Sequence, residues 1–161
     1  MVHIQRMTKR KLGEVLLHEN LVTKEQVEEA LGEQGQTGEL LGEILVRKGY
    51  VSEKNIAETI ATQYSFPYLE PDQYYISSEV VQLLPLEVVD KHSVLPLDRF
   101  GDLLTVVVAG PLQEEVLQEI EELTGCQVQV FISTVTAVRK AIEGLKDNQR
   151  RAASERDAYG G

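Results

Sequence analysis

A tandem repeat with a spacing of 29 residues constrains the fold of this chain more than any other feature. Residues 11–34 read KLGEVLLHENLVTKEQVEEALGEQ and residues 40–63 read LLGEILVRKGYVSEKNIAETIATQ, with GQTGE between them. Seven of the 24 paired positions are identical, and four further pairs are apolar in both copies. A period of this length is typical of a supersecondary unit used again. Two copies predict a pseudo-twofold unit, because a solenoid needs more.

Each copy is predicted to form a helix, a short turn and a second helix. Leu12, Val15, Leu16 and Glu19 follow the i, i+3, i+4, i+7 spacing of one helix face within residues 9–19, and the first three are apolar. Asn20 and Gly49 stand at equivalent positions, and both residue types tolerate the left-handed conformation that ends a helix. Residues 23–26 form a capping box and residues 52–55 a weaker version of it, which predicts the start of each second helix.

The rest of the chain alternates between strand-like and helix-like segments. The expected elements are helices near 78–84, 86–92, 112–123 and 135–145, strands on both sides of a turn at 98–102, and a third strand at 126–132. The fold class is therefore α+β: an N-terminal four-helix tandem-repeat unit of two helix-turn-helix hairpins, followed by a small α/β subdomain with a short sheet. The predicted boundaries are 8–64 for the repeat subdomain, 65–71 for a connector, 72–146 for the α/β subdomain and 147–161 for a disordered tail or linker.

The formal net charge of −10 argues against duplex nucleic acid, whose affinity for proteins comes mainly from neutralised phosphates. The charge is uneven, since Arg6, Lys9, Arg10 and Lys11 all precede Glu14, the first acidic residue. These cations are interpreted either as solvated charges on a terminus or as a patch that attracts an anion to the first repeat.

The expected location is the cytoplasm. No apolar run approaches the roughly 20 residues of a membrane span, so no direct membrane insertion is predicted. The basic N-terminus lacks the apolar segment of a secretory signal. A single cysteine, Cys126, fits a reducing compartment.

The residues that enzymes use are not grouped in this sequence. It contains neither a phosphate loop nor a dinucleotide-binding glycine motif. Its three histidines are scattered, and no base can be assigned to Cys126. We therefore predict a protein without catalytic residues, metal or cofactor. A hydrolase or transferase is the least favoured function, because no catalytic set of residues is present.

Two features of the repeat indicate a specific role. A glycine inside a helix costs about 1 kcal/mol relative to alanine, so Gly13 and Gly42 need a reason. Either close helix packing or the close approach of a ligand would supply it. Gln34 and Gln63 end both copies in line with the apolar stripe, where an amide can cap a backbone group or read the edge of a base.

The repeats resemble the tandem motif of the MshEN domain, the N-terminal regulatory domain of type II secretion and type IV pilus assembly ATPases. The resemblance extends over about residues 8–146, through the FPYLE segment and the strand that ends in AGP. It implies a non-enzymatic domain that binds cyclic di-GMP, each copy cradling half of the ligand, and that contacts a motor domain or an inner-membrane platform protein. The residues it implies for the ligand are Arg10, Lys11, Leu12, Gly13, Leu16, Val27, Leu31, Gln34, Leu40, Leu41, Gly42, Leu45, Ile56, Ile60 and Gln63.

The sequence departs from the family pattern at the opening of each copy, where arginine is common. Lys11 keeps the charge without the planar guanidinium, and Leu40 removes the polar group. The alternative function is therefore a protein-docking module that engages a platform component without binding nucleotide. The chain ends before any ATPase domain, so an excised regulatory domain and a stand-alone regulator are both consistent with it.

Overall fold

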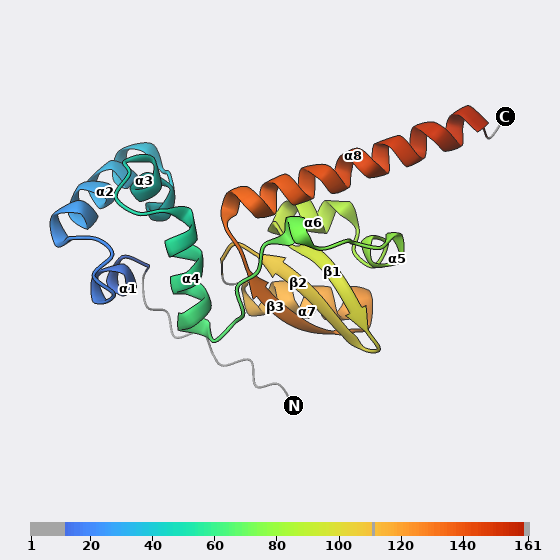
Figure 1. Ribbon diagram of the computed structural model, residues 1–161, viewed down its shortest axis with the longest axis horizontal. Helices are drawn as coiled ribbons and strands as arrows, with labels where there is room; N and C mark the ends of the chain where they lie inside the picture. The colour runs from blue at the N-terminus through green and yellow to red at the C-terminus, as the bar shows by residue number, and fades with distance from the viewer. Residues whose placement is uncertain (1–11, 111, 160–161) are drawn as a thin grey trace. The chain divides into compact units, whose positions relative to one another are not determined.

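The computed structural model describes residues 12–110 and 112–159, and the chain divides into two compact units, residues 1–66 and 67–161 (Figure 1). We call them unit 1 and unit 2 and describe each by itself. The described part of unit 1 is helical, whereas unit 2 contains helices and a three-stranded sheet. The predicted α+β class is confirmed.

Unit 1 consists of two helical hairpins. Its helices are α1 (Leu12–His18), α2 (Lys24–Thr37), α3 (Leu41–Arg47) and α4 (Glu53–Tyr64). The first helix of each hairpin ends in the same way, because Asn20 and Gly49 both have a positive φ, of 57° and 77°. The following residues, Leu21 and Tyr50, each donate a backbone hydrogen bond of 3.0 Å to the carbonyl five residues earlier. These are Schellman endings, as the repeat predicted.

The second helix of each hairpin begins at the predicted cap. The Thr23 hydroxyl accepts from the backbone of Gln26 at 3.2 Å, and the Gln26 side chain accepts from the backbone of Thr23 at 2.9 Å. In the other copy the Ser52 hydroxyl accepts from the backbone of Asn55 at 3.1 Å. The full capping box in copy one and its weaker counterpart in copy two are both confirmed.

The two hairpins meet at Gly13 and Gly42. A Cβ atom on Gly13 would lie 3.2 Å from Leu41 Cδ2 and 3.3 Å from Val27 Cγ1. A Cβ atom on Gly42 would lie 3.2 Å from Leu12 Cδ2 and 3.5 Å from Ile56 Cδ1. Each contact of Gly13 has its equivalent at Gly42 when the residue numbers are shifted by 29. The contact between α1 and α3 therefore has pseudo-twofold symmetry. Close helix packing is therefore the reason for both glycines.

Unit 2 is a small sheet with helices around it. In chain order it contains η1 (Pro71–Gln73), α5 (Ser78–Val81), α6 (Leu86–His92), β1 (Leu95–Phe100), β2 (Leu103–Val108), α7 (Glu114–Thr124), β3 (Gln127–Ile132) and α8 (Val135–Tyr159). The strand order is β1-β2-β3, with β1 antiparallel and β3 parallel to β2. Consecutive residues 106, 107 and 108 of β2 are all buried, so both faces of this strand are covered, as its continuous apolar sequence predicted.

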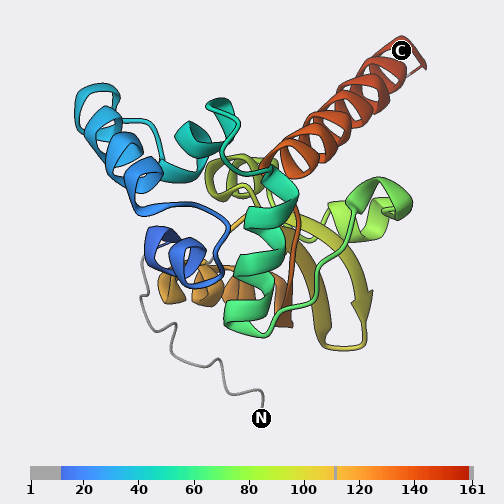
Figure 2. The same cartoon turned by 60° about the vertical axis from the view of Figure 1, so that its left-hand side comes forward.

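Helix α8 is the main departure from the predicted fold. It continues to Tyr159, so the expectation of a disordered tail or linker at 147–161 is wrong for the described residues up to 159. Figures 1 and 2 both show its C-terminal half extending beyond the sheet of unit 2. Good helix formers and ion pairs one turn apart, such as Arg150–Asp147 at 3.7 Å, support a helix without an apolar stripe. Near its middle, Lys146 forms an ion pair of 2.6 Å with Asp90 of α6, which raises the pKa of Lys146.

Smaller differences concern the ends of elements. Helix α7 begins at Glu114 instead of near Leu112, which is buried in the segment before it. The cap of α5 is Ser77, whose hydroxyl accepts from the backbone of Val80 at 3.3 Å. Tyr68, in the predicted connector, forms a single bridge to Ile132.

The pseudo-twofold contact predicts opposite effects for two glycine-to-alanine substitutions. Gly13→Ala should lower the free energy of unfolding by about 1 kcal/mol, because overpacking against the stiff, buried Val27 outweighs the gain in helix propensity. Gly32→Ala in α2 should raise it by about 0.5–1 kcal/mol, since a Cβ there meets nothing within 4 Å. Urea unfolding followed by circular dichroism measures both. Equal stabilisation by the two variants would show that the α1–α3 contact is loose.

Candidate functional site

The structure divides the residues implied for the ligand into a buried and an accessible group. Gly13, Leu16, Val27, Leu45 and Ile60 are buried, and Leu16 and Leu45 are completely enclosed in the core of unit 1. Leu12, Gln34, Leu41, Gly42, Ile56 and Gln63 are partly exposed, and Leu31 and Leu40 are exposed. Arg10 and Lys11 lie outside the described residues, as do Arg6 and Lys9. The buried group shapes unit 1, and the accessible group is available for direct contact.

Leu40 is the most accessible apolar side chain of the predicted set. It is the N-cap residue of α3, makes no side-chain cap hydrogen bond and is 67% exposed. Leu31 on α2 is 48% exposed, whereas its repeat partner Ile60 is 8% exposed. Leu31 is thus exposed at a repeat position that is buried in copy two, and Leu40 stands where copy one has Lys11.

The two repeat glutamines lie in different surroundings. Gln34 is partly exposed near the end of α2, where its backbone carbonyl accepts the capping bond from Gly38 at 2.9 Å. The amide nitrogen of Gln63 is buried and has no hydrogen-bond partner within the described ranges 12–110 and 112–159. A buried donor without a partner costs about 1–3 kcal/mol. A glutamine therefore stands at the same position in both copies, but its surroundings differ between them.

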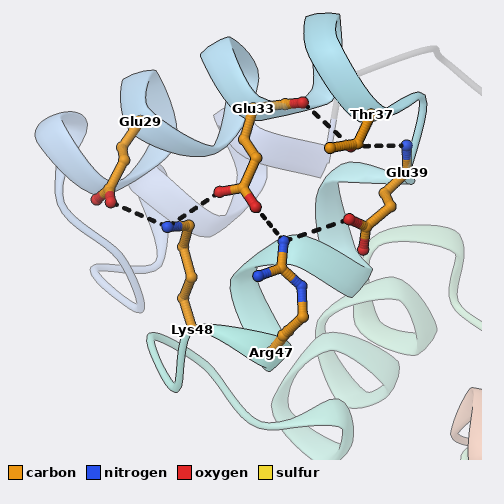
Figure 3. A network of polar contacts seen from close by, with 6 residues as sticks. All are labelled: Glu29, Glu33, Thr37, Glu39, Arg47 and Lys48. Atoms are coloured by element: carbon orange, nitrogen blue, oxygen red, sulfur yellow. Dashed lines mark hydrogen bonds and ion pairs between the residues drawn. The ribbon is translucent and has the colours of Figure 1, made fainter.

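A network of charged side chains joins α2 to α3 (Figure 3). Glu33 of α2 lies between the two cations of α3, paired with Arg47 and lying 3.0 Å from the amine of Lys48. Lys48 also pairs with Glu29 at 3.0 Å, and Arg47 with Glu39 at 3.3 Å. Several charges held in one network hold two helices together better than an isolated surface ion pair does.

The network shifts the pKa values of its members in the directions expected for mutual support. Hydrogen bonds from Tyr50, at 2.6 Å, and from Lys48 lower the pKa of Glu29. The hydrogen bonds from Arg47 and Lys48 lower the pKa of Glu33. The pKa of Lys48 is raised in turn, chiefly by its bond to Glu33. Each charge is thus favoured in the folded state.

Sequence reasoning missed this network, although a signal for it exists. Glu29 and Glu33 are four residues apart on one helix face, and Arg47 and Lys48 end the next helix with the opposite charge. Their pairing depends on how α2 packs against α3, which the periodicity of the sequence does not specify. As for metals, the residues that the structure describes contain no group of three ligating side chains.

Comparison with known families identifies the class. A sequence profile of the MshEN domain matches residues 64–152, more than half of the chain. The chain belongs to the MshEN domain family. The matched segment lies almost entirely in unit 2, so it supports the resemblance read from the repeats through a different part of the chain.

The relatives found are type IV pilus assembly ATPases named PilB. The protein from Myxococcus xanthus is 30% identical over 133 residues, which cover 83% of this chain and 24% of the relative. The protein from Thermus thermophilus is 33% identical over 135 residues, which cover 83% of this chain and 15% of the relative. The chain therefore spans about a quarter or less of the length of these relatives.

Solved structures share the fold. The structure of MshE with cdg has a TM-score of 0.74 and 24% identity, over 85% of this chain and 99% of that one. The N-terminal domain of XpsE has a TM-score of 0.68 and 23% identity, over 86% of this chain and 96% of that one. Among the described helices, none combines the length and the hydropathy needed to cross a membrane.

The pKa shifts predict that the α2–α3 network weakens in acid. Because the pKa values of Glu29 and Glu33 are lowered on folding, their contribution is present above the ordinary value of 4.5 and is lost as the pH falls below it. Glu33→Gln should therefore lower Tm at pH 7, and its difference from the wild type should shrink toward about pH 3.

Thermal unfolding followed by circular dichroism across this pH range measures the effect. Glu28→Gln is the matched control, since Glu28 is an exposed carboxylate of the same helix outside the network. A Tm difference for Glu33→Gln that stays constant from neutral to acid pH would contradict the prediction.

Proposed function

We propose that unit 1 binds cyclic di-GMP and that the protein is a non-enzymatic regulatory domain of a type IV pilus or secretion motor. The observation that carries the proposal is the pseudo-twofold contact at Gly13 and Gly42. A cyclic dinucleotide with two identical halves suits two equivalent motifs side by side. Membership of the MshEN family and the shared fold with MshE, whose structure is described with cdg, support the same ligand.

The accessible repeat residues are suited to such a ligand. Leu31 and Leu40 offer exposed apolar surface for guanine faces, and Gln34 offers an amide for a base edge. Lys11 and Arg10, one and two residues before the first described residue of α1, would supply positive charge for the phosphates. Copy two has no cation at the equivalent position, because Leu40 stands there.

The wider setting follows from the relatives. Both are type IV pilus assembly ATPases, of which this chain corresponds to a minor part. We propose that it acts in the cytoplasm on such a motor and that ligand binding stiffens the connector at residues 65–71. Equal hydrogen exchange of that connector with and without cyclic di-GMP would exclude this coupling.

Calorimetric titration of the full chain with cyclic di-GMP tests the binding proposal. Saturable binding is expected, and Gln34→Ala should weaken it about tenfold, the effect of losing one or two hydrogen bonds. Gln36→Ala is the matched control, because Gln36 is an exposed glutamine of the same helix outside the repeat pattern. GTP serves as the ligand control. No heat from a folded protein would favour the alternative, a docking module that engages a platform component without nucleotide.

Restoring a cation to copy two should strengthen the binding. Leu40→Arg places a guanidinium at an exposed position, and we expect Kd for cyclic di-GMP to fall about three- to tenfold. The gain should shrink as the salt concentration rises, because an exposed charge pair is screened. Leu40→Gln, polar but uncharged, is the control. An unchanged Kd for Leu40→Arg at low salt would remove this position from the proposed site.

A further inference from the structure

The pseudo-twofold arrangement makes the α2–α3 contact and the α4–α1 contact equivalent. Stepping by 29 residues takes Glu29 and Glu33 of α2 to Glu58 and Thr62 of α4. Subtracting 29 residues from the three partners at the end of α3 gives positions at the end of α1. Arg47 corresponds to His18, Lys48 to Glu19 and Tyr50 to Leu21. The network between α2 and α3 thus has a defined counterpart place between α4 and α1.

That counterpart place holds a groove instead of a network. The groove has a volume of about 560 Å³ and lies within unit 1. The residues of its lining that matter here are His18, Glu19, Leu21, Glu58, Thr62 and Gln63. Of the five equivalent positions of the network, four carry a different type of residue in the groove, and only the acid at Glu58 is the same.

The groove is acidic, whereas the α2–α3 network contains charges of both signs. Glu19 stands at the position equivalent to the cation Lys48, so carboxylates line the groove from the residue after α1 and from α4. Each has an ion-pair partner nearby in sequence: Glu19 lies 4.0 Å from His18, and Glu58 lies 3.9 Å from Lys54. Imidazole is not a permanent cation, unlike the guanidinium that Arg47 contributes at the equivalent position.

We propose that this groove is a docking site for a basic segment of a partner protein. An arginine or lysine of that segment pairs with both Glu19 and Glu58, in the way that Lys48 pairs with both Glu29 and Glu33 between α2 and α3. Three features favour this occupant: the carboxylates of Glu19 and Glu58 in the lining, a net charge of −10, and a volume that suits a few side chains. The same carboxylates disfavour an anionic nucleotide in the groove, although Gln63 of its lining is also one of the residues implied for cyclic di-GMP.

Fluorescence polarisation of the full chain with a labelled Gly-Arg-Lys-Arg-Gly peptide tests the proposal. We expect saturable binding that Glu19→Gln and Glu58→Gln each weaken about five- to tenfold. Glu28→Gln removes the same charge from an exposed position of α2 and should leave the affinity within twofold of wild type. An equal loss in all three variants, or no saturable binding, would overturn the proposal and leave only general attraction to an acidic protein.

A second variant tests the structural reasoning directly. His18→Arg, Glu19→Lys and Thr62→Glu together copy the charges of the α2–α3 network into the groove. We expect this triple variant to lose peptide binding and to unfold at a higher Tm than the wild type. Cyclic di-GMP titration of the same variant reports separately on the proposed nucleotide site. Peptide binding that persists in the triple variant, with Tm unchanged or raised, would place the basic segment elsewhere.

Discussion

The close approach of α1 to α3 is the constraint on which unit 1 depends. Each helix places a glycine against a leucine of the other, at a distance where an added Cβ would lie 3.2 Å from that leucine. The glycines therefore lower helix propensity locally but allow the two hairpins to pack with pseudo-twofold symmetry. Leu16 and Leu45 become completely buried in the resulting core. The repeated Leu-Gly pair is thus explained by packing before any ligand is considered.

Charge breaks the symmetry that packing creates. Glu29 and Glu33 face Arg47 and Lys48 across the α2–α3 contact, whereas the equivalent contact between α4 and α1 is a groove. The apolar positions at the centre of the repeat, such as Leu16 and Leu45, are buried in both copies and are alike. Surface positions are free to differ, and the differences leave one side of unit 1 closed and the other open and acidic.

The two units carry different parts of the evidence for function. Family membership rests on residues 64–152, which make up most of unit 2, whereas the argument for a symmetric ligand rests on the repeats in unit 1. Unit 2 has its own core around β2, and Asp90 and Lys146 join α6 to α8 within it. The regulatory proposal combines a binding unit with a unit that is characteristic of the N-terminal part of pilus motors.

Hydrophobic periodicity and local capping residues determined much of this protein without tertiary information. The Schellman endings at Asn20 and Gly49, the cap at Thr23 and the buried strand β2 follow from short-range patterns, because their hydrogen bonds close within a few residues or depend on continuous burial. Tertiary structure alone decided why Gly13 and Gly42 are glycines, which leucines are core and which are exposed, and where charges meet. Those outcomes depend on atoms that the fold brings together from helices far apart in the sequence. The extension of α8 to Tyr159 also escaped prediction, since a helix supported by propensity and ion pairs shows no apolar periodicity.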